Sequence, residues 1–334
     1  MSVADKTSVA RLPKIELHVH FEGCIGARML WGMSAGKRMG LQKIQQLFNF
    51  NDFGGFLQAY TRVMNMLEAA EDFRQVARET ALKLHAQNVI YVEFTFTPLP
   101  HVRRGLDHGR VIENIMQGLE DARAEGSRLD VAFIYDTVRQ WGAAAALESV
   151  ELAIEDMRRG LPVVGFGVGG DELGCPAAEE LKPAFESAAG AGLKRYVHAG
   201  EVGGPESVRE AVELLGADRI GHGISAARDP ELMALLGERE VCLDVCPTSN
   251  VFTRAVDSYE KNPWPVLAAA GVPVTIGSDD PGFFGAWLDD ELARCAATWQ
   301  LSEEDLRTLM LTAARYSFQP NERREELVRQ VGTD

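Results

Sequence analysis

The sequence of 334 residues has little of what would identify a secreted, metal-thiolate or membrane protein. Its five cysteines are scattered, odd in number and without a C-x-x-C spacing, which suits a reducing cytoplasm. No stretch approaches the length of a membrane span, and residues 1–10 carry no apolar run. We therefore expect a cytoplasmic protein without a transmembrane helix or a secretory signal.

Positive charge is also scarce. The 34 Lys and Arg residues are outnumbered by 49 Asp and Glu, which gives a formal net charge of −15 and a pI near 5.0. A broad nucleic-acid footprint needs a basic surface, and so does binding to anionic membranes, so we expect neither partner. The binding of a small neutral molecule would not depend on this charge. The sequence leaves open whether the protein is a monomer or a homo-oligomer.

Short apolar runs rich in β-branched residues predict the fold. Eight such runs occur, at residues 14–20, 89–97, 129–135, 162–168, 194–198, 218–222, 241–245 and 272–277. Helical patterns separate them; for example, Phe73, Val76, Ala77, Ala81 and Leu84 fall on one helical face. Strands that alternate with helices in this way predict a (β/α)8 TIM barrel, and we expect residues 1–334 to form one domain.

One connection is too long for a single helix. Residues 24–68 predict extra helices, inserted after the first strand, that lie partly over the barrel mouth, where loops after the strands build pockets. Near the other end of the chain, Ser302 and Asp305 form a capping-box pattern that predicts one or two closing helices. The glycine-rich segment 165–172 lacks the context of a nucleotide-binding fingerprint, and we interpret it as a loop brought close to a ligand.

Four histidines lie at the expected carboxyl ends of strands, where barrel active sites occur. His18 and His20 are two residues apart on the first strand, so their imidazoles point to one face and form half of a metal site. An isolated pair of this kind is more often a polar edge strand. His198 and His222 end the fifth and sixth strands, and we give the other three histidines no role.

Carboxylates follow the same strand ends. Glu201 stands three residues after His198, across the small pair Ala-Gly, which suits a glutamate that moves protons beside a metal; a surface turn that starts a helix is the alternative. Asp279 and Asp280 follow the eighth strand. Two buried adjacent carboxylates would repel unless one binds a cation and the other a substrate; a capped turn is the alternative.

Together these motifs resemble the adenosine deaminase family of metal-dependent aminohydrolases, within the amidohydrolase superfamily. The resemblance runs from about residue 12 to about residue 318, with the motifs in the family's order. It also includes Gly170-Asp171-Glu172, Arg139 and the segment Cys246-Pro247-Thr248-Ser249-Asn250.

The resemblance implies a zinc-dependent reaction. One Zn²⁺ would be held by four side chains, those of His18, His20, His198 and Asp279. Glu201 would protonate ring nitrogen N1 of a 6-aminopurine while water attacks C6. His222 would hold and polarise the attacking water, with Asp279 assisting its deprotonation. The products would be a 6-oxopurine and ammonia.

The resemblance also implies how the substrate binds. Asp280 would accept a hydrogen bond from a ring nitrogen on the imidazole side of the purine, the Gly170 backbone would meet N3, and His20 and Glu22 would lie beside the substrate. Adenosine deaminases usually carry Asp at the position of Glu22, which contacts the sugar. Segment 280–285 is more similar to adenine deaminases.

These departures leave the exact substrate open. The leading prediction is an adenosine-type nucleoside, and the alternatives are aminodeoxyfutalosine, an adenosine derivative of the menaquinone route, and free adenine. A hydrolase of esters or amides and a non-catalytic binding protein are the alternatives from other classes. Arg62, in the insertion, is a candidate partner for an anionic substituent, although a solvated arginine is the simpler interpretation.

Overall fold

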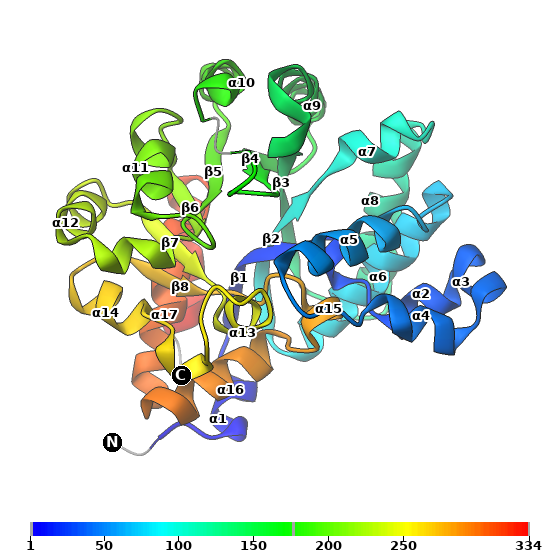
Figure 1. Cartoon of the computed structure of the whole chain (residues 1–334). Helices are drawn as coiled ribbons and strands as arrows, with labels where there is room; N and C mark the ends of the chain where they lie inside the picture. Colours follow the sequence, from blue (N-terminus) through cyan, green and yellow to red (C-terminus); the bar gives the residue numbers. More distant parts are fainter. Residues whose placement is uncertain (1–2, 176–177, 333–334) are drawn as a thin grey trace.

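In the computed structural model, which describes residues 3–175 and 178–332, eight parallel strands lie in sequence order in one sheet (Figure 1). They are β1 (Lys14–His20), β2 (Val89–Phe96), β3 (Asp130–Val138), β4 (Val163–Gly169), β5 (Lys194–Ala199), β6 (Arg219–His222), β7 (Cys242–Val245) and β8 (Val274–Ile276). The amide of His20 donates to the Asp279 carbonyl (2.8 Å) and the amide of Asp279 to the His18 carbonyl (2.9 Å), which joins β1 to the segment after β8. The predicted (β/α)8 TIM barrel is confirmed.

Helices follow the strands and surround them (Figure 1). They are α6 (Ala70–Ala86), α7 (Pro98–Arg103), α8 (His108–Ala124), α9 (Gly142–Arg158), α10 (Ala178–Ala191), α11 (Pro205–Glu213), α12 (Pro230–Glu238), α13 (Pro247–Phe252), α14 (Trp264–Ala269), α15 (Pro281–Phe284) and α16 (Leu288–Trp299). The apolar face predicted for residues 73–84 belongs to α6 and is buried. No helix in the described ranges is long and apolar enough to cross a membrane.

Helices at the two ends of the described chain pack beside the barrel. They are α1 (Lys6–Arg11), α17 (Glu303–Tyr316) and α18 (Asn321–Gly332). The amide of Asp305 donates to the Ser302 hydroxyl (3.2 Å) and the amide of Ser302 to the Asp305 carboxylate (2.8 Å). The predicted capping box is therefore present at the start of α17.

The long connection after β1 holds four short helices before α6 begins. They are α2 (Ala27–Gly32), α3 (Ser34–Met39), α4 (Leu41–Leu47) and α5 (Phe53–Met64). In Figure 1 they lie to one side of the barrel, in blue. The amphipathic α5 is the one that reaches the carboxyl ends of the strands, as described below. That residues 1–334 form a single domain stays a prediction.

The glycine-rich segment 165–172 was predicted as a loop, but its first half belongs to β4. A Cβ atom at Gly167 would lie 2.8 Å from the carbonyl oxygen of Tyr196 on the neighbouring strand, so only glycine fits this close approach. Only from Gly170 onward is the segment a loop.

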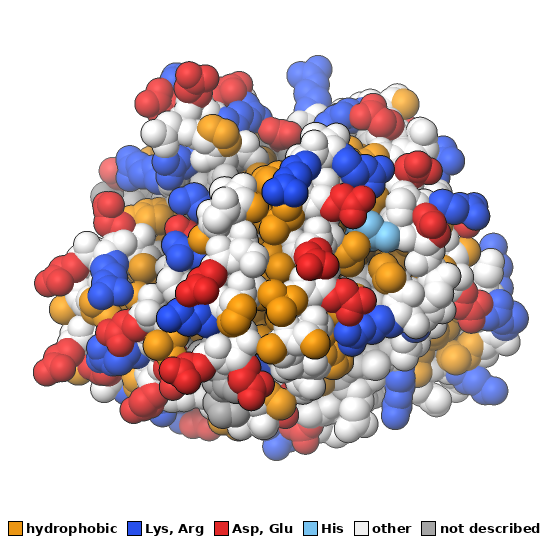
Figure 2. Space-filling model, turned by 90° about the horizontal axis from the view of Figure 1, so that it is seen from above, with side chains coloured by type: hydrophobic (Ala, Val, Ile, Leu, Met, Phe, Trp, Pro, Cys, Tyr) orange, Lys and Arg blue, Asp and Glu red, His pale blue; other side chains and the backbone are white. Residues whose placement is uncertain are grey.

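The surface carries charges of both signs. Figure 2 shows acidic and basic side chains interspersed on the face that it views, with hydrophobic side chains between them.

Candidate active site

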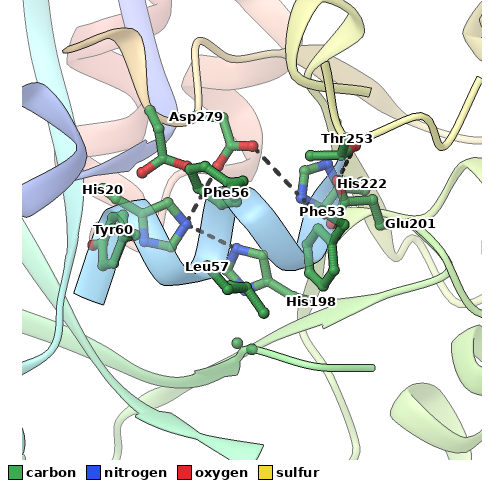
Figure 3. Close-up of a pocket in the computed structure, with 13 residues that line it drawn as sticks. His20, Phe53, Phe56, Leu57, Tyr60, His198, Glu201, His222, Thr253 and Asp279 are labelled. Atoms are coloured by element: carbon green, nitrogen blue, oxygen red, sulfur yellow. Dashed lines mark hydrogen bonds and ion pairs between the residues drawn. The ribbon is translucent and has the colours of Figure 1, made fainter. Parts of the chain in front are cut away.

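Side chains from β1, β5, β6 and the segment after β8 converge at the carboxyl ends of the strands. Figure 3 shows His20, His198, His222 and Asp279 pointing toward one another. A carboxylate oxygen of Asp279 lies 3.3 Å from Nε2 of His18 and 3.3 Å from Nε2 of His20. Nε2 of His20 lies 3.2 Å from Nε2 of His198. The structure thus brings together all four residues that the resemblance implies as ligands.

Small residues and unusual backbone angles make this convergence possible. A Cβ at Gly221 would lie 3.0 Å from the ring of His198 and 3.2 Å from that of His18, so a larger residue would push the imidazoles apart. His222 and Asp279 have φ of 65° and 62°, in the left-handed region that non-glycine residues rarely occupy. Such strain is typical of functional sites, where the surrounding structure holds it in place.

Backbone carbonyls fix the protonation of two imidazoles. Nδ1 of His18 lies 2.8 Å from the Asp244 carbonyl oxygen, and Nδ1 of His198 lies 3.0 Å from that of Val168. A carbonyl only accepts, so both Nδ1 atoms carry hydrogen and both Nε2 atoms present a lone pair to the centre. Nε2 of His18 is buried and has no hydrogen-bond partner. A buried lone pair without a donor suits a metal ligand.

Charge interactions in the cluster also favour a cation. Burial raises the pKa of Asp279, but interactions with His18 and His20 outweigh it and leave the pKa well below its ordinary value. Burial lowers the pKa of His20, but Asp280 and Asp279 outweigh that and raise it to about 10. An ionised carboxylate beside several imidazoles suits a bound cation. Three imidazole nitrogens and one carboxylate oxygen form a donor set that suits zinc.

Glu201 lies beside this cluster. One carboxyl oxygen accepts a hydrogen bond from the Thr253 hydroxyl (2.9 Å), and the other lies 3.5 Å from Nε2 of His222. Burial and the nearby charge of Asp279 raise the pKa of Glu201 to about 8. The side chain is therefore protonated near neutral pH and can act as an acid.

The turn that carries Glu201 is held by Glu172, whose role the sequence did not reveal. The Glu172 carboxylate is buried and accepts hydrogen bonds from four consecutive backbone amides, those of residues 200–203. The guanidinium of Arg139 donates to the carbonyl oxygen of His198 at the start of the same turn. The motif residues at 139 and 172 thus support both ends of the segment between His198 and Glu201.

We expect Glu172→Gln to lower kcat by about 10- to 100-fold. One carboxylate oxygen is replaced by an NH2 group, which cannot accept hydrogen bonds from the backbone amides of the turn. The turn therefore shifts. The KM and the metal content should stay close to those of the unchanged protein. Steady-state kinetics and metal analysis test this. The matched control is Asp171→Asn, because Asp171 caps only its own loop through the Gly174 amide (2.9 Å). Equal effects of the two substitutions would contradict the role of Glu172.

Glu22 lies just beyond the end of the first strand. The strand β1 ends at His20, and Glu22 begins a short 3₁₀ turn, residues 22–24. Its buried carboxylate accepts from the Thr97 amide (3.3 Å) and lies 3.0 Å from Nε2 of His101, while its other oxygen has no partner. Glu22 is not among the residues that line the cavity. Contact between Glu22 and a substrate stays a prediction.

His101, to which we gave no role, lies in α7 and supports Glu22. A guanidinium nitrogen of Arg104 donates to Nδ1 of His101 (2.7 Å), so the neutral ring carries its hydrogen on Nε2, toward Glu22. A histidine in the segment after β2 was a signal for this contact, but the partner is 79 residues away in the sequence.

A cavity of about 480 Å³, including its open mouth, lies beside the cluster. Four residues of α5 form one apolar wall, namely Phe53, Phe56, Leu57 and Tyr60 (Figure 3). Gly170, with φ of 101°, lines it from the loop after β4. Asp280 also lines it, and burial together with the charge of Asp279 raises the pKa of Asp280 well above its ordinary value. Arg62 is exposed on α5 and does not line the cavity.

Comparisons with known proteins agree with this geometry. A family model described as adenosine deaminase matches residues 13–334. The chain is 39% identical over 315 residues to an aminodeoxyfutalosine deaminase of Streptomyces avermitilis, which covers 93% of this chain and 87% of that protein. It is 33% identical over 312 residues to an adenine deaminase of Streptomyces coelicolor, with 92% and 89% covered.

Solved structures agree as well. The crystal structure of an adenine deaminase from Arthrobacter aurescens matches with a TM-score of 0.88 and 28% identity, and covers 96% of this chain and 98% of that one. The family model alone matches nearly the whole sequence. This chain belongs to the adenosine deaminase family.

Proposed function

We propose that this protein is a zinc-dependent aminohydrolase that converts a 6-aminopurine nucleoside to the 6-oxopurine and ammonia. The observation that carries the proposal is Glu201, whose pKa is raised to about 8 and whose carboxyl group lies 3.5 Å from Nε2 of His222, beside the imidazoles that surround Asp279. An acid at this position can protonate a ring nitrogen only while it keeps its proton, so its raised pKa suits the task.

The zinc ion would be held by His18, His20, His198 and Asp279, and a bound zinc lowers the pKa of water toward neutrality. Glu201 donates its proton to ring nitrogen N1, which makes C6 more electrophilic. The second oxygen of Asp279 lies 3.9 Å from Nε2 of His222, and these two groups face the space where the attacking water belongs. Asp279 accepts a proton from that water and passes it to the amino group, which leaves as ammonia, while His222 orients the water.

Asp280 is a hydrogen-bond donor in this proposal. Nitrogen N7 of a 9-substituted purine has a lone pair and no hydrogen, so a carboxylate would repel it. A protonated Asp280, which its raised pKa favours, donates to N7 instead. This reverses the direction of the hydrogen bond expected from the sequence. The Gly170 amide would donate to N3 from the opposite side.

The charge of the cavity supports a substrate without a phosphate group. None of the cavity-lining residues, all within the described part of the chain, is Lys or Arg, whereas three are carboxylic acids. The aromatic wall from α5 favours a purine with a bulky apolar substituent over bare adenine. The 39% identity to an aminodeoxyfutalosine deaminase favours that adenosine derivative as the second candidate substrate.

Ammonia release from adenosine, adenine, aminodeoxyfutalosine and other 5′-modified adenosines tests the proposal. Deamination of one or more of these is expected. An absence of ammonia from the whole panel, with metal bound, would favour a hydrolase of esters or amides or a binding protein and would overturn the proposed reaction.

We expect the unchanged protein to prefer a modified adenosine over adenosine, and Glu22→Asp to shift kcat/KM toward adenosine. Asp is shorter by one methylene, which retracts the carboxylate by about 1 Å, enough to break or make one hydrogen bond. The panel above, measured with both proteins, is the test. Arg62→Gln is the control, and it should leave the ranking unchanged because Arg62 is exposed outside the cavity. If adenosine is already preferred and Glu22→Asp does not change the ranking, Glu22 does not determine specificity.

A further inference from the structure

A row of buried amide groups stands behind His222, on the side away from the cavity. The side-chain nitrogen of Asn250 lies 3.2 Å from Nδ1 of His222. The side-chain nitrogen of Asn262 lies 3.0 Å from the side-chain oxygen of Asn250. The backbone amide of Trp264 lies 3.2 Å from the side-chain oxygen of Asn262. The side chains of Asn250 and Asn262 are 0% and 2% exposed, so water does not compete for these bonds.

The direction of every bond in this row follows from its far end. A backbone amide only donates, so Asn262 must present its oxygen to Trp264 and its nitrogen to Asn250. Asn250 must then present its oxygen to Asn262 and its nitrogen to His222. Since that nitrogen donates, Nδ1 of His222 must accept, and the neutral ring carries its hydrogen on Nε2.

This assignment separates His222 from its neighbours. Nitrogen or oxygen atoms of His18, His198, His222 and Asp279 all lie within 4.8 Å of one another, so distance alone would admit His222 as a metal ligand. His18 and His198, however, donate from Nδ1 to backbone carbonyls and offer a free lone pair at Nε2. His222 has the opposite tautomer, and an Nε2 atom that carries hydrogen cannot bind a metal.

We propose that Asn250 and Asn262 are positioning residues that set the Nε2–H tautomer of His222, which excludes this ring from the metal site and makes it a hydrogen-bond donor toward the reacting oxygen. Its consequence for the reaction rests on the proposed deaminase function, but the tautomer itself does not. The Nε2–H group lies 3.5 Å from Glu201 and 3.9 Å from Asp279, between the two groups that move protons. A fixed donor there supports the oxygen as negative charge develops on it.

The tautomer can be measured without any assay of activity. Nitrogen NMR of the metal-loaded protein, labelled with ¹⁵N in the histidine rings, distinguishes protonated from unprotonated ring nitrogens, and loss of a signal in His222→Gln assigns His222. We expect His222 to carry hydrogen on Nε2 and none on Nδ1. We expect His18 and His198 to show the opposite tautomer, with hydrogen on Nδ1. A protonated Nδ1 on His222 would overturn the proposal, whatever the substrate proves to be.

Two substitutions then test the row. Asn250→Leu keeps a similar volume and removes the donor, and Asn262→Leu removes the group that orients Asn250. In each variant we expect kcat to fall by about tenfold or more, the KM and metal content to stay within about twofold, and His222 to show a mixture of tautomers. Asn114→Leu is the control, because Asn114 is a half-buried asparagine of α8 whose side chain donates to the Arg110 carbonyl of its own helix (2.9 Å).

A purely structural role predicts lower thermal stability without a change of tautomer, and that result would overturn the proposal. So would a kcat within about twofold of the unchanged protein. If one variant fails to fold, the other variant and the nitrogen NMR spectrum of the unchanged protein still test the proposal.

Discussion

Replacing Glu201 by Gln should lower kcat by about 10²–10⁴-fold, while the protein keeps its metal and its fold. The side chain is isosteric, so the hydrogen bond from the Thr253 hydroxyl can persist at the oxygen of the new amide. What the amide lacks is an acidic proton. It therefore cannot protonate N1 of the purine.

The measurement is kcat on the best substrate of the panel, together with metal content and thermal stability. Glu206→Gln is the matched control, because Glu206 is exposed at the start of α11, five residues further along the chain. A Glu201→Gln protein within a few-fold of the unchanged kcat would remove Glu201 from the mechanism. A protein that lost its metal as well would show that Glu201 supports the cluster and not only the reaction.

The fold and the convergence of the site could be predicted because both depend on short-range patterns and one general rule. Alternating apolar residues identify strands, and helical faces between them identify a barrel. The carboxyl ends of barrel strands meet at one face, so residues at those ends must come together whatever their separation in sequence. His18, His198 and Asp279 therefore lie within one small volume although they come from β1, β5 and the segment after β8.

The supporting contacts could not be predicted because they join distant residues whose geometry no local pattern contains. Glu172 bonds to amides 28 to 31 residues away, and His101 meets Glu22 across 79 residues. The orientation of Glu22 could not be predicted for a related reason. Alternation predicts direction only while a strand lasts, and the backbone turns into a 3₁₀ turn at Glu22, directly after β1.

The polar residues behind the site show what a motif alone leaves out. The segment 246–250 was noticed only as part of the family pattern, and nothing in it indicates that Asn250 faces His222. The orientation of the Asn250 side chain toward His222 depends on a second contact. The path of the chain after α13 brings Asn262 back to Asn250. Recognition of the family thus located the reacting groups, whereas the structure was needed to find the groups that orient them.

Replacing His18 by Ala should remove metal and activity together. We expect about one divalent metal ion per chain in protein purified without chelators, held by His18, His20, His198 and Asp279. The loss of one imidazole leaves an incomplete donor set around the Asp279 carboxylate. His222 cannot substitute, because its Nε2 carries hydrogen, and His222→Ala should accordingly keep most of the metal while losing turnover.

Metal analysis, kcat and the melting temperature, each measured on His18→Ala, His222→Ala and the control His85→Ala, test this prediction. His85 lies on α6, away from the cluster, so its replacement should change neither metal content nor kcat. Metal binds the folded state, so the unchanged protein should melt at a lower temperature after chelation; at a free metal concentration of about 100 times Kd the stabilisation is about 2.7 kcal/mol. Full activity in metal-free protein would contradict the metal site altogether, and a His18→Ala protein that kept its metal would show that the ligands lie elsewhere in the cluster.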